Sequence, residues 1–153
     1  MDHRQWVEDH RDDLRQQSEM LQGTIGRMAN NSLAVKQVGL TVWSAIVGFG
    51  FTNKNAALFG LAFVTFALFG VLDIYYLYLE RKFRDNFNRL VRILGGFWRE
   101  GDEAWLESKQ GNFLKPDMTT KFLGQVPSVL KSWANLPYLV TLVITAVLLQ
   151  VPL

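Results

Sequence analysis

Two long apolar stretches, separated by a short polar one, dominate the first half of the chain. Val38–Phe51 and Ala56–Leu72 contain no charged residue, and only the sequence Thr-Asn-Lys-Asn at 52–55 lies between them. A helix needs about 20 largely apolar residues to cross a bilayer, with about 17 as a practical minimum. Both stretches reach this length with their flanking residues. The pattern therefore predicts a transmembrane helical hairpin with spans at 33–51 and 56–79.

A third apolar stretch, Leu136–Leu153, also contains no charge. Its 18 residues extend about 27 Å at the helical rise, which is just enough to cross a thin hydrocarbon layer. A helix buried in a protein core is the alternative. The absence of charge and the neighbouring Trp133 and Tyr138 favour a third span at 136–153.

The N-terminal segment, residues 1–32, is predicted to be cytosolic and to begin with a polar helix over 1–23. Two glycines, Gly23 and Gly26, are expected to allow the helix to break or bend. Its apolar positions recur at helical spacing and form a narrow seam. The seam consists of Leu14, Leu21, Ile25 and Met28.

The second span has no stop signal where its apolar stretch ends. Residues 80–98 alternate apolar and basic positions at helical period, so we expect one long helix that leaves the bilayer and continues to Trp98. Residues 100–117 are expected to be mostly turn or loop. A shorter amphipathic stretch follows at 119–133, and the whole region 80–135 is predicted to be a cytosolic helical region.

The distribution of cations predicts the orientation. Of the 16 lysines and arginines, only Lys54 lies in the turn between the first two spans. Positively charged residues stay preferentially in the cytoplasm. We therefore expect a bacterial inner-membrane protein with its N-terminus in the cytoplasm and its C-terminus in the periplasm.

Composition excludes several classes of function. The chain has no cysteine, which excludes disulfides, thiol catalysis and thiolate metal sites. The formal net charge of +2 is too small to indicate direct binding of nucleic acid. His3 and His10 share a helical face, but further metal ligands at suitable spacing are missing. No phosphate-binding glycine loop, nucleophile elbow or acid–base pair is present, so we expect neither an enzyme nor a cofactor.

Asp73 is the one acid within the apolar part of a span. An ionisable residue in the membrane is a functional candidate whose partner has to be found. Lys36, near the same bilayer face on the first span, is the expected partner, and Asn31 and Ser32 are weaker ones. Because nearby tyrosines resemble an interfacial belt, the sequence favours an anchoring role for Asp73 at the inner headgroup boundary. The alternative is an ion or proton site.

Small residues recur at helix–helix spacing on both spans. In lipid, such positions let two backbones approach closely and drive association. We expect one stripe to pack the hairpin, and a role of the other between protomers is open. The stripes include Ser44 and Gly48 on the first span and Gly60, Ala67 and Gly70 on the second.

Basic residues follow the second span along one helical face. This face is a candidate site for anionic lipid headgroups or for the phosphates of a nucleotide messenger, and a solvated surface is the alternative. Its members are Arg81, Arg84, Arg89, Arg92 and Arg99.

Two segments resemble a group of small uncharacterised bacterial membrane proteins. They are 21–32 (LQGTIGRMANNS) and 72–84 (LDIYYLYLERKFR), supported by Ser-Trp at 132–133 and Leu-Pro-Tyr at 136–138. In layout, a hairpin with a cytosolic helical extension is also similar to the two-span effector modules of bacterial conflict systems. Those modules include ones associated with nucleotide-second-messenger immunity and CRISPR. The resemblance implies that the protein oligomerises and perturbs the inner membrane once triggered.

The sequence thus predicts an all-α integral membrane protein with three transmembrane helices and a small helical cytosolic region. The leading hypothesis is an oligomeric inner-membrane effector of bacterial defence that perturbs membrane permeability when triggered from the cytosol. Its expected partners are the lipid bilayer, further copies of the chain, and a cytosolic protein or nucleotide messenger. The alternative is a non-conducting anchor or scaffold that recruits a cytosolic partner.

Overall fold

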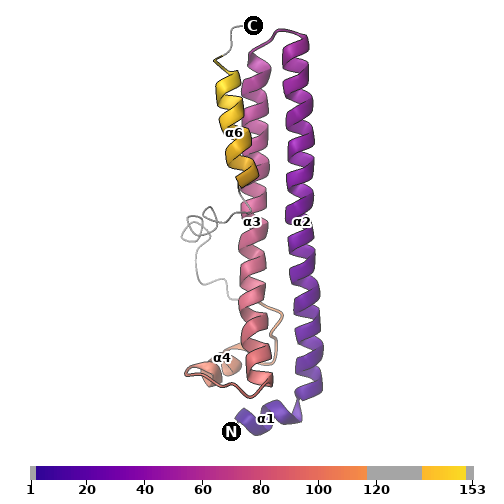
Figure 1. Cartoon of the computed structure of the whole chain (residues 1–153). Helices are drawn as coiled ribbons and strands as arrows, with labels where there is room; N and C mark the ends of the chain where they lie inside the picture. Colours follow the sequence, from indigo (N-terminus) through magenta and orange to yellow (C-terminus); the bar gives the residue numbers. More distant parts are fainter. Residues whose placement is uncertain (1–2, 117–135, 151–153) are drawn as a thin grey trace. The chain divides into compact units, whose positions relative to one another are not determined.

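The computed structural model describes residues 3–116 and 136–150 (Figure 1). Within these ranges every regular element is an α-helix, as predicted. The helices are α1 (His3–Asp9), α2 (Arg11–Thr52), α3 (Ala57–Leu94), α4 (Asp102–Lys109) and α6 (Leu136–Leu148). The amphipathic stretch expected at 119–133 lies outside the described residues.

The turn between α2 and α3 lies where the polar residues predict it. Lys54 has a left-handed backbone with a φ of 48°. The side-chain Oδ1 of Asn55 accepts a hydrogen bond of 3.0 Å from the backbone N–H of Ala57. A side-chain oxygen in this position satisfies one of the free N–H groups at a helix start. The polar residues between the apolar stretches thus end one helix and cap the next.

α2 is longer towards its N-terminus than predicted. It runs without a break through Gly23 and Gly26, so the long helix tolerates these glycines and does not break at them. A glycine inside a helix costs only about 1 kcal/mol relative to alanine. The fully buried Leu14 and Leu21 each contribute about 2 kcal/mol by leaving water, which outweighs that cost. The chain turns instead at His10, between α1 and α2.

α3 continues past the apolar stretch, as predicted, but ends at Leu94 instead of Trp98. Gly96 has a φ of 79°, and the N–H groups of Gly96 and Phe97 donate hydrogen bonds to the carbonyls of Ile93 and Arg92. This pattern of a left-handed glycine and two closing hydrogen bonds is a common helix stop. The glycine pair therefore ends α3 and reverses the chain.

α4 lies within residues 100–117, where mostly turn or loop was expected, and it adds a short helix that was not predicted, while the other described residues of this range are turn or loop. The helix is short and its sequence is weakly amphipathic, which hides it from periodicity alone. Asp102 and Glu103 in the first turn complement the helix dipole. Leu106 is buried in the apolar core. This tertiary contact stabilises a helix that the local sequence favours only weakly.

The described residues divide into two compact units, and both α2 and α3 carry residues of both. Unit 1 comprises the residues up to Met28 together with the described residues from Leu79 onward to 116. Unit 2 comprises Ala29–Tyr78 and residues 136–150.

Unit 1 has an apolar core to which α1, α2, α3 and α4 all contribute. The seam predicted on the N-terminal helix and the apolar face predicted after the second span meet in it. Its buried members are Val7, Leu14, Leu21, Leu90, Ile93, Leu106 and Phe113. Trp6, Phe83, Phe87, Leu94, Trp98 and Trp105 pack against them.

The segment after α4 is held to unit 1 by two side-chain amides. Gln17 on α2 accepts a hydrogen bond from the N–H of Phe113 and donates one to the carbonyl of Gly111, both at 2.9 Å. Asn86 on α3 donates to the carbonyls of Phe113 and Lys115 at 3.1 and 2.9 Å. Because a buried backbone group needs a partner, these amides determine the path of this segment.

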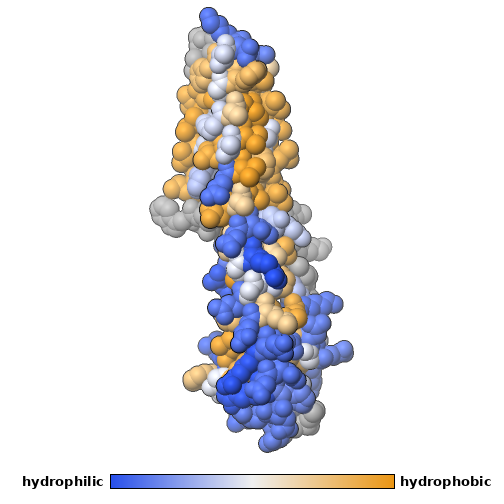
Figure 2. Space-filling model, turned by 90° about the vertical axis from the view of Figure 1, so that its right-hand side faces the viewer, coloured by the Kyte–Doolittle hydropathy of each residue, from blue (hydrophilic) through white to orange (hydrophobic). Residues whose placement is uncertain are grey.

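Unit 2 presents large apolar side chains on its outer surface. By length and composition, α2 and α3 are each long and apolar enough to cross a bilayer, and only 17% and 28% of their most apolar windows are buried. Leu61, Val64, Leu68 and Val71 on α3 are 52–66% exposed. Figure 2 shows apolar side chains covering this part of the chain and hydrophilic ones covering unit 1.

α6 packs in unit 2, where Leu148 contacts the cluster of Val47, Phe59 and Ala62. The helix has 13 residues, which corresponds to about 20 Å at the helical rise. A span of the hydrocarbon layer takes about 20 residues. The predicted third span over 136–153 is therefore not shown by the described helix, and residues 151–153 lie outside the described part.

Candidate functional site

Asp73 lies at the centre of a buried polar cluster in unit 2 and is itself fully buried. The ammonium nitrogen of Lys36 is 2.8 Å from its Oδ1 and 2.7 Å from its Oδ2. The hydroxyl of Ser32 donates a hydrogen bond of 2.5 Å to Oδ1 and accepts one of 2.8 Å from Lys36. The structure thus brings together Asp73 and Lys36, which the sequence analysis paired, and adds Ser32 as a third member.

The geometry of the hairpin explains this arrangement. Lys36 and Asp73 lie at equal sequence distances from the turn, so antiparallel helices place them at the same level. Ser32 and Lys36 are four residues apart and therefore share one face of α2. At the helical rise, the cluster lies about 24 Å from the turn along the helix axis. If the turn lies at one surface of a bilayer, the cluster falls near the far boundary of a hydrocarbon layer of about 30 Å.

The cluster is costly to bury and therefore depends on mutual contact. Moving each ion out of water costs several kcal/mol even after relaxation, and only a well-formed pair with further hydrogen bonds offsets this. The side chain of Lys36 is 18% exposed and that of Asp73 is 0% exposed. The aspartate thus depends on its lysine, while the lysine retains some access to its surroundings.

Tyr138 on α6 packs beside this cluster. Its ring centroid is 6.0 Å from the ammonium of Lys36 and 5.0 Å from the ring centroid of Phe66. A Cβ atom added at Gly70 would lie 3.3 Å from the Tyr138 ring, so this glycine provides the space for the ring. Within the described part of the chain, the buried hydroxyl of Tyr138 has no hydrogen-bond partner.

A second polar contact joins α6 to α2. The indole N–H of Trp43 donates a hydrogen bond of 2.8 Å to the hydroxyl of Thr145, which in turn donates to the carbonyl of Thr141 at 2.8 Å. Thr145 is fully buried. Apolar surfaces are not directional, whereas this hydrogen bond is, so it sets the rotation and register of α6.

The small residues of the predicted stripes occupy different environments. Gly70 lies against Tyr138, as described above, and Ala67 is half-buried. By contrast, Gly48 and Gly60 have no atom within 4 Å of an added Cβ, and Ser44 is exposed. The tight contacts between α2 and α3 instead involve Gly39 and Gly50, where an added Cβ would lie 3.0 Å from Cβ of Phe69 and 2.7 Å from the ring of Phe59.

Two arginines of the predicted basic face bind an internal carboxylate in unit 1. Nε of Arg89 and Nη2 of Arg92 lie 2.8 and 2.7 Å from Oδ1 of Asp102, which is fully buried. The backbone N–H of Arg99 donates to Oδ2 at 2.8 Å. These contacts hold the start of α4 against α3.

The remaining side chains of that face lie nearer the surface of unit 1. Arg84 pairs with Glu80 one turn away, with its side chain 55% exposed. Arg81 is half-buried on α3, and Arg99 is exposed. The face therefore combines internal ion pairs with surface cations.

The pKa of Asp102 reflects these contacts. Burial by itself raises the pKa, because it disfavours the charged carboxylate. The hydrogen bond from the Arg99 backbone and the charges of Arg89 and Arg92 act in the opposite direction. They prevail, so the pKa lies below the usual value of 3.8. Asp102 therefore remains ionised throughout the physiological range.

No protein-family model, curated protein or solved structure matches this chain. The functional proposal therefore depends on the chain's own residues and their geometry.

Asp102, Tyr138 and Thr145 were not identified from the sequence as site residues. For Asp102 a signal exists, because the glycines after α3 reverse the chain and an acid then follows two arginines spaced three apart. For Tyr138 and Thr145 no local signal exists. Their partners Phe66 and Trp43 lie 72 and 102 positions away, and the contacts depend on how α6 packs.

Proposed function

We propose that this chain is an oligomeric inner-membrane effector of bacterial defence that perturbs membrane permeability when a signal reaches its cytosolic unit. In this proposal α2 and α3 cross the membrane, unit 2 lies in the bilayer and unit 1 lies in the cytoplasm. The observation that carries the proposal is that α2 and α3 each contribute residues to both units. A change in unit 1 therefore acts on the same two helices that are apolar enough to cross a bilayer.

The exposed apolar surface of unit 2 supports the membrane location. A helix in the core of a soluble protein is mostly buried, whereas most of the apolar windows of α2 and α3 are exposed. Soluble monomers rarely present contiguous apolar surfaces of more than a few hundred Å². Lipid tails cover such a surface without cost.

The buried cluster of Ser32, Lys36 and Asp73 supports a change between two arrangements. A buried ion without its partner is costly, so an arrangement of α2 and α3 that separates Lys36 from Asp73 is disfavoured. Ionisable residues within membrane segments are rare and commonly mark functional positions. We therefore assign to this cluster the role of holding the resting arrangement of the hairpin.

The open faces of the small residues support association between copies. Ser44 is exposed, and neither Gly48 nor Gly60 has a neighbour within 4 Å of an added Cβ. Small residues at such positions allow close approach of a helix from another copy. In the proposal these positions lie between protomers.

The test is the membrane potential of bacterial cells that express the full chain with Asp73→Asn. The change removes one charge of the resting pair and keeps the shape of the side chain. We expect depolarisation, reported by a potential-sensitive dye. Asp85→Asn, at an exposed position on the same helix, is the control and should leave the potential unchanged. An unchanged potential for the Asp73 variant, at equal amounts in the membrane, would refute the proposal.

The same cells distinguish the proposed effector from the alternative, a non-conducting anchor. A non-conducting anchor would leave the potential intact with every variant. It would also copurify with the same cytosolic protein from unperturbed membranes.

A further inference from the structure

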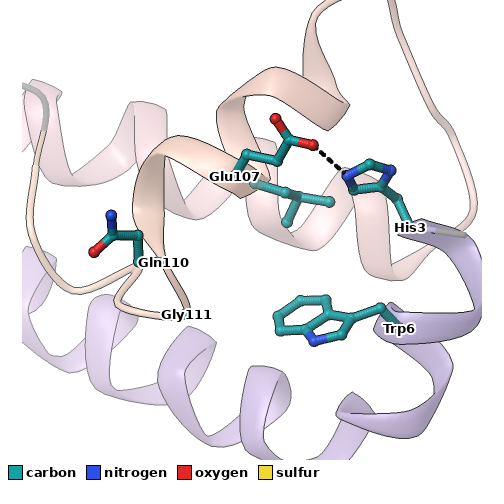
Figure 3. A pocket seen from close by; sticks show the side chains of 6 residues that line it. His3, Trp6, Glu107, Gln110 and Gly111 are labelled. Carbon is teal, nitrogen blue, oxygen red and sulfur yellow. Dashed lines mark hydrogen bonds and ion pairs between the residues drawn. The ribbon is translucent and has the colours of Figure 1, made fainter. Parts of the chain in front are cut away.

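Unit 1 contains a cavity of about 360 Å³ between α1 and α4 (Figure 3). This volume falls in the range of small-molecule and side-chain binding sites, about 300–1,000 Å³. Its lining residues come from the first helix, the end of α4 and the turn that follows. They are His3, Trp6, Leu106, Glu107, Gln110 and Gly111.

One wall of the cavity is the indole ring of Trp6. The ring stacks on His10, with centroids 4.5 Å apart and an interplanar angle of 22°. It also packs against the apolar core of unit 1. Figure 3 shows the ring across the cavity from the pair formed by His3 and Glu107. The cavity thus has a fixed aromatic surface on one side and polar groups on the other.

The opposite wall carries a carboxylate. Oε1 of Glu107 lies 3.0 Å from Nε2 of His3. The side chain of Glu107 is 68% exposed, whereas that of His3 is 20% exposed. The imidazole thus holds one carboxylate oxygen, and the carboxylate as a whole remains accessible to an incoming group.

The rim of the cavity is preformed. Gln110 and Gly111 have left-handed backbones with φ values of 48° and 78°. A left-handed residue other than glycine is strained and persists only when its surroundings hold it. Here the amide of Gln17 binds the carbonyl of Gly111 at 2.9 Å and the N–H of Phe113 at 2.9 Å. Gln110 lines the cavity, and its side-chain amide points away from Trp6 (Figure 3).

The charge of the cavity determines what it accepts. Among the described residues that line it, Glu107 contributes a carboxylate, and none is a lysine or an arginine. The neighbouring cations are engaged elsewhere: Arg4 lies over the ring of Trp98, and Lys109 lies over the ring of Trp105. An anionic ligand would therefore meet a like charge.

We propose that this cavity binds a guanidinium group. A planar cation is attracted to the face of an indole ring by the quadrupole of the ring. Its N–H donors match a carboxylate in a forked geometry. Trp6 would supply the aromatic face and Glu107 the carboxylate. The group would come from the arginine side chain of a protein partner or from a free guanidinium compound.

The test is a calorimetric titration of the full chain in detergent micelles with arginine amide. Citrulline amide is the matched ligand, because it has the same shape and replaces the guanidinium by a neutral urea. We expect arginine amide to bind and citrulline amide to bind at least tenfold more weakly. Equal binding of the two would overturn the proposal, since charge would then have no part in recognition.

Two variants locate the site. Glu107→Gln should weaken the binding of arginine amide at least tenfold. Glu103→Gln removes an exposed acid on the same helix that does not line the cavity and should change the affinity less than twofold. Equal effects of both variants would show non-specific attraction and overturn the proposal. These titrations report binding alone, so they are independent of any change in permeability.

The source of the group is distinguished with two further probes. Methylguanidinium presents the head group alone, and the peptide Gly-Gly-Arg-Gly-Gly presents it on a backbone. Tighter binding of the peptide indicates a protein partner, and equal binding indicates a free compound. If neither binds and adenosine does, the cavity accepts a neutral heterocycle and the proposal is wrong.

Discussion

The ammonium nitrogen of Lys36 lies 2.7 Å from a carboxylate oxygen of Asp73, across the two helices of the hairpin. The two residues are 37 positions apart, so the chain must fold back at the turn before they meet. Because Asp73 is fully buried, the fold of the hairpin depends on this ion pair.

Breaking this pair from one side should destabilise unit 2 strongly. Lys36→Met leaves the carboxylate of Asp73 buried without a counter-charge, which typically costs about 3–5 kcal/mol. The double variant Lys36→Met, Asp73→Met removes both charges and should unfold close to the wild type. The measurement is thermal unfolding in mild detergent, followed by circular dichroism. If the double variant is no more stable than the single one, the pair does not hold the hairpin.

Acid should loosen unit 1 through Asp102. The pKa of this carboxyl is below 3.8 in the folded protein, so the folded state binds its proton less readily than the unfolded state. Its contribution is therefore complete above the unfolded pKa of about 3.9 and is lost as the pH falls through the folded pKa. The measurement is denaturant unfolding between pH 7 and pH 2, followed by tryptophan fluorescence.

Asp102→Asn serves as the comparison for this pH dependence. The variant loses the charge that Arg89 and Arg92 contact and should be less stable by about 2–4 kcal/mol at pH 7. The difference between the two proteins should shrink below pH 4. A constant difference over the whole range would show that the charge of Asp102 is not what stabilises α4.

Gly39 and Gly48 should respond very differently to the same substitution. An added Cβ at Gly39 would lie 3.0 Å from Cβ of Phe69, whereas at Gly48 no atom lies within 4 Å. Gly39→Val should therefore destabilise the hairpin by about 1–3 kcal/mol through overpacking, and Gly48→Val should not. Unfolding in detergent measures the first effect. Equal losses for both variants would contradict the packing of α2 against α3.

Gly48→Val also tests the proposed association between copies of the chain, separately from the stability of the hairpin. In the proposed oligomer this glycine faces another copy, so the variant should dissociate at unchanged hairpin stability. Light scattering in detergent measures the oligomeric state.

Two substitutions on α6 should have different effects on the stability of the protein. Tyr138 has a buried hydroxyl without a partner among the described residues, so Tyr138→Phe should keep or raise stability. Thr145 accepts a hydrogen bond of 2.8 Å from Trp43, so Thr145→Val should cost about 1–2 kcal/mol by leaving the indole N–H unpaired. Thermal unfolding checks both. A larger loss for Tyr138→Phe than for Thr145→Val would place α6 differently on the hairpin.

The sequence by itself determined the features that depend on local order. The apolar stretches, the polar residues at 52–55 and the amphipathic continuation of the second helix predict α2, the turn and much of α3. Their positions follow because helical periodicity and turn chemistry act over a few residues. The pairing of Lys36 with Asp73 was also predictable, because an antiparallel hairpin places residues at equal sequence distances from its turn at the same level.

Only the tertiary structure decided what depends on the rotation of one helix against another. Periodicity left open which stripe of small residues packs the hairpin, and in the structure the close approaches of α2 to α3 are at Gly39 and Gly50. The burial of Asp102 and the cavity between Trp6 and Glu107 require the chain to reverse after α3. A single helix exposes all of its faces. Which face becomes buried depends on the element that packs against it.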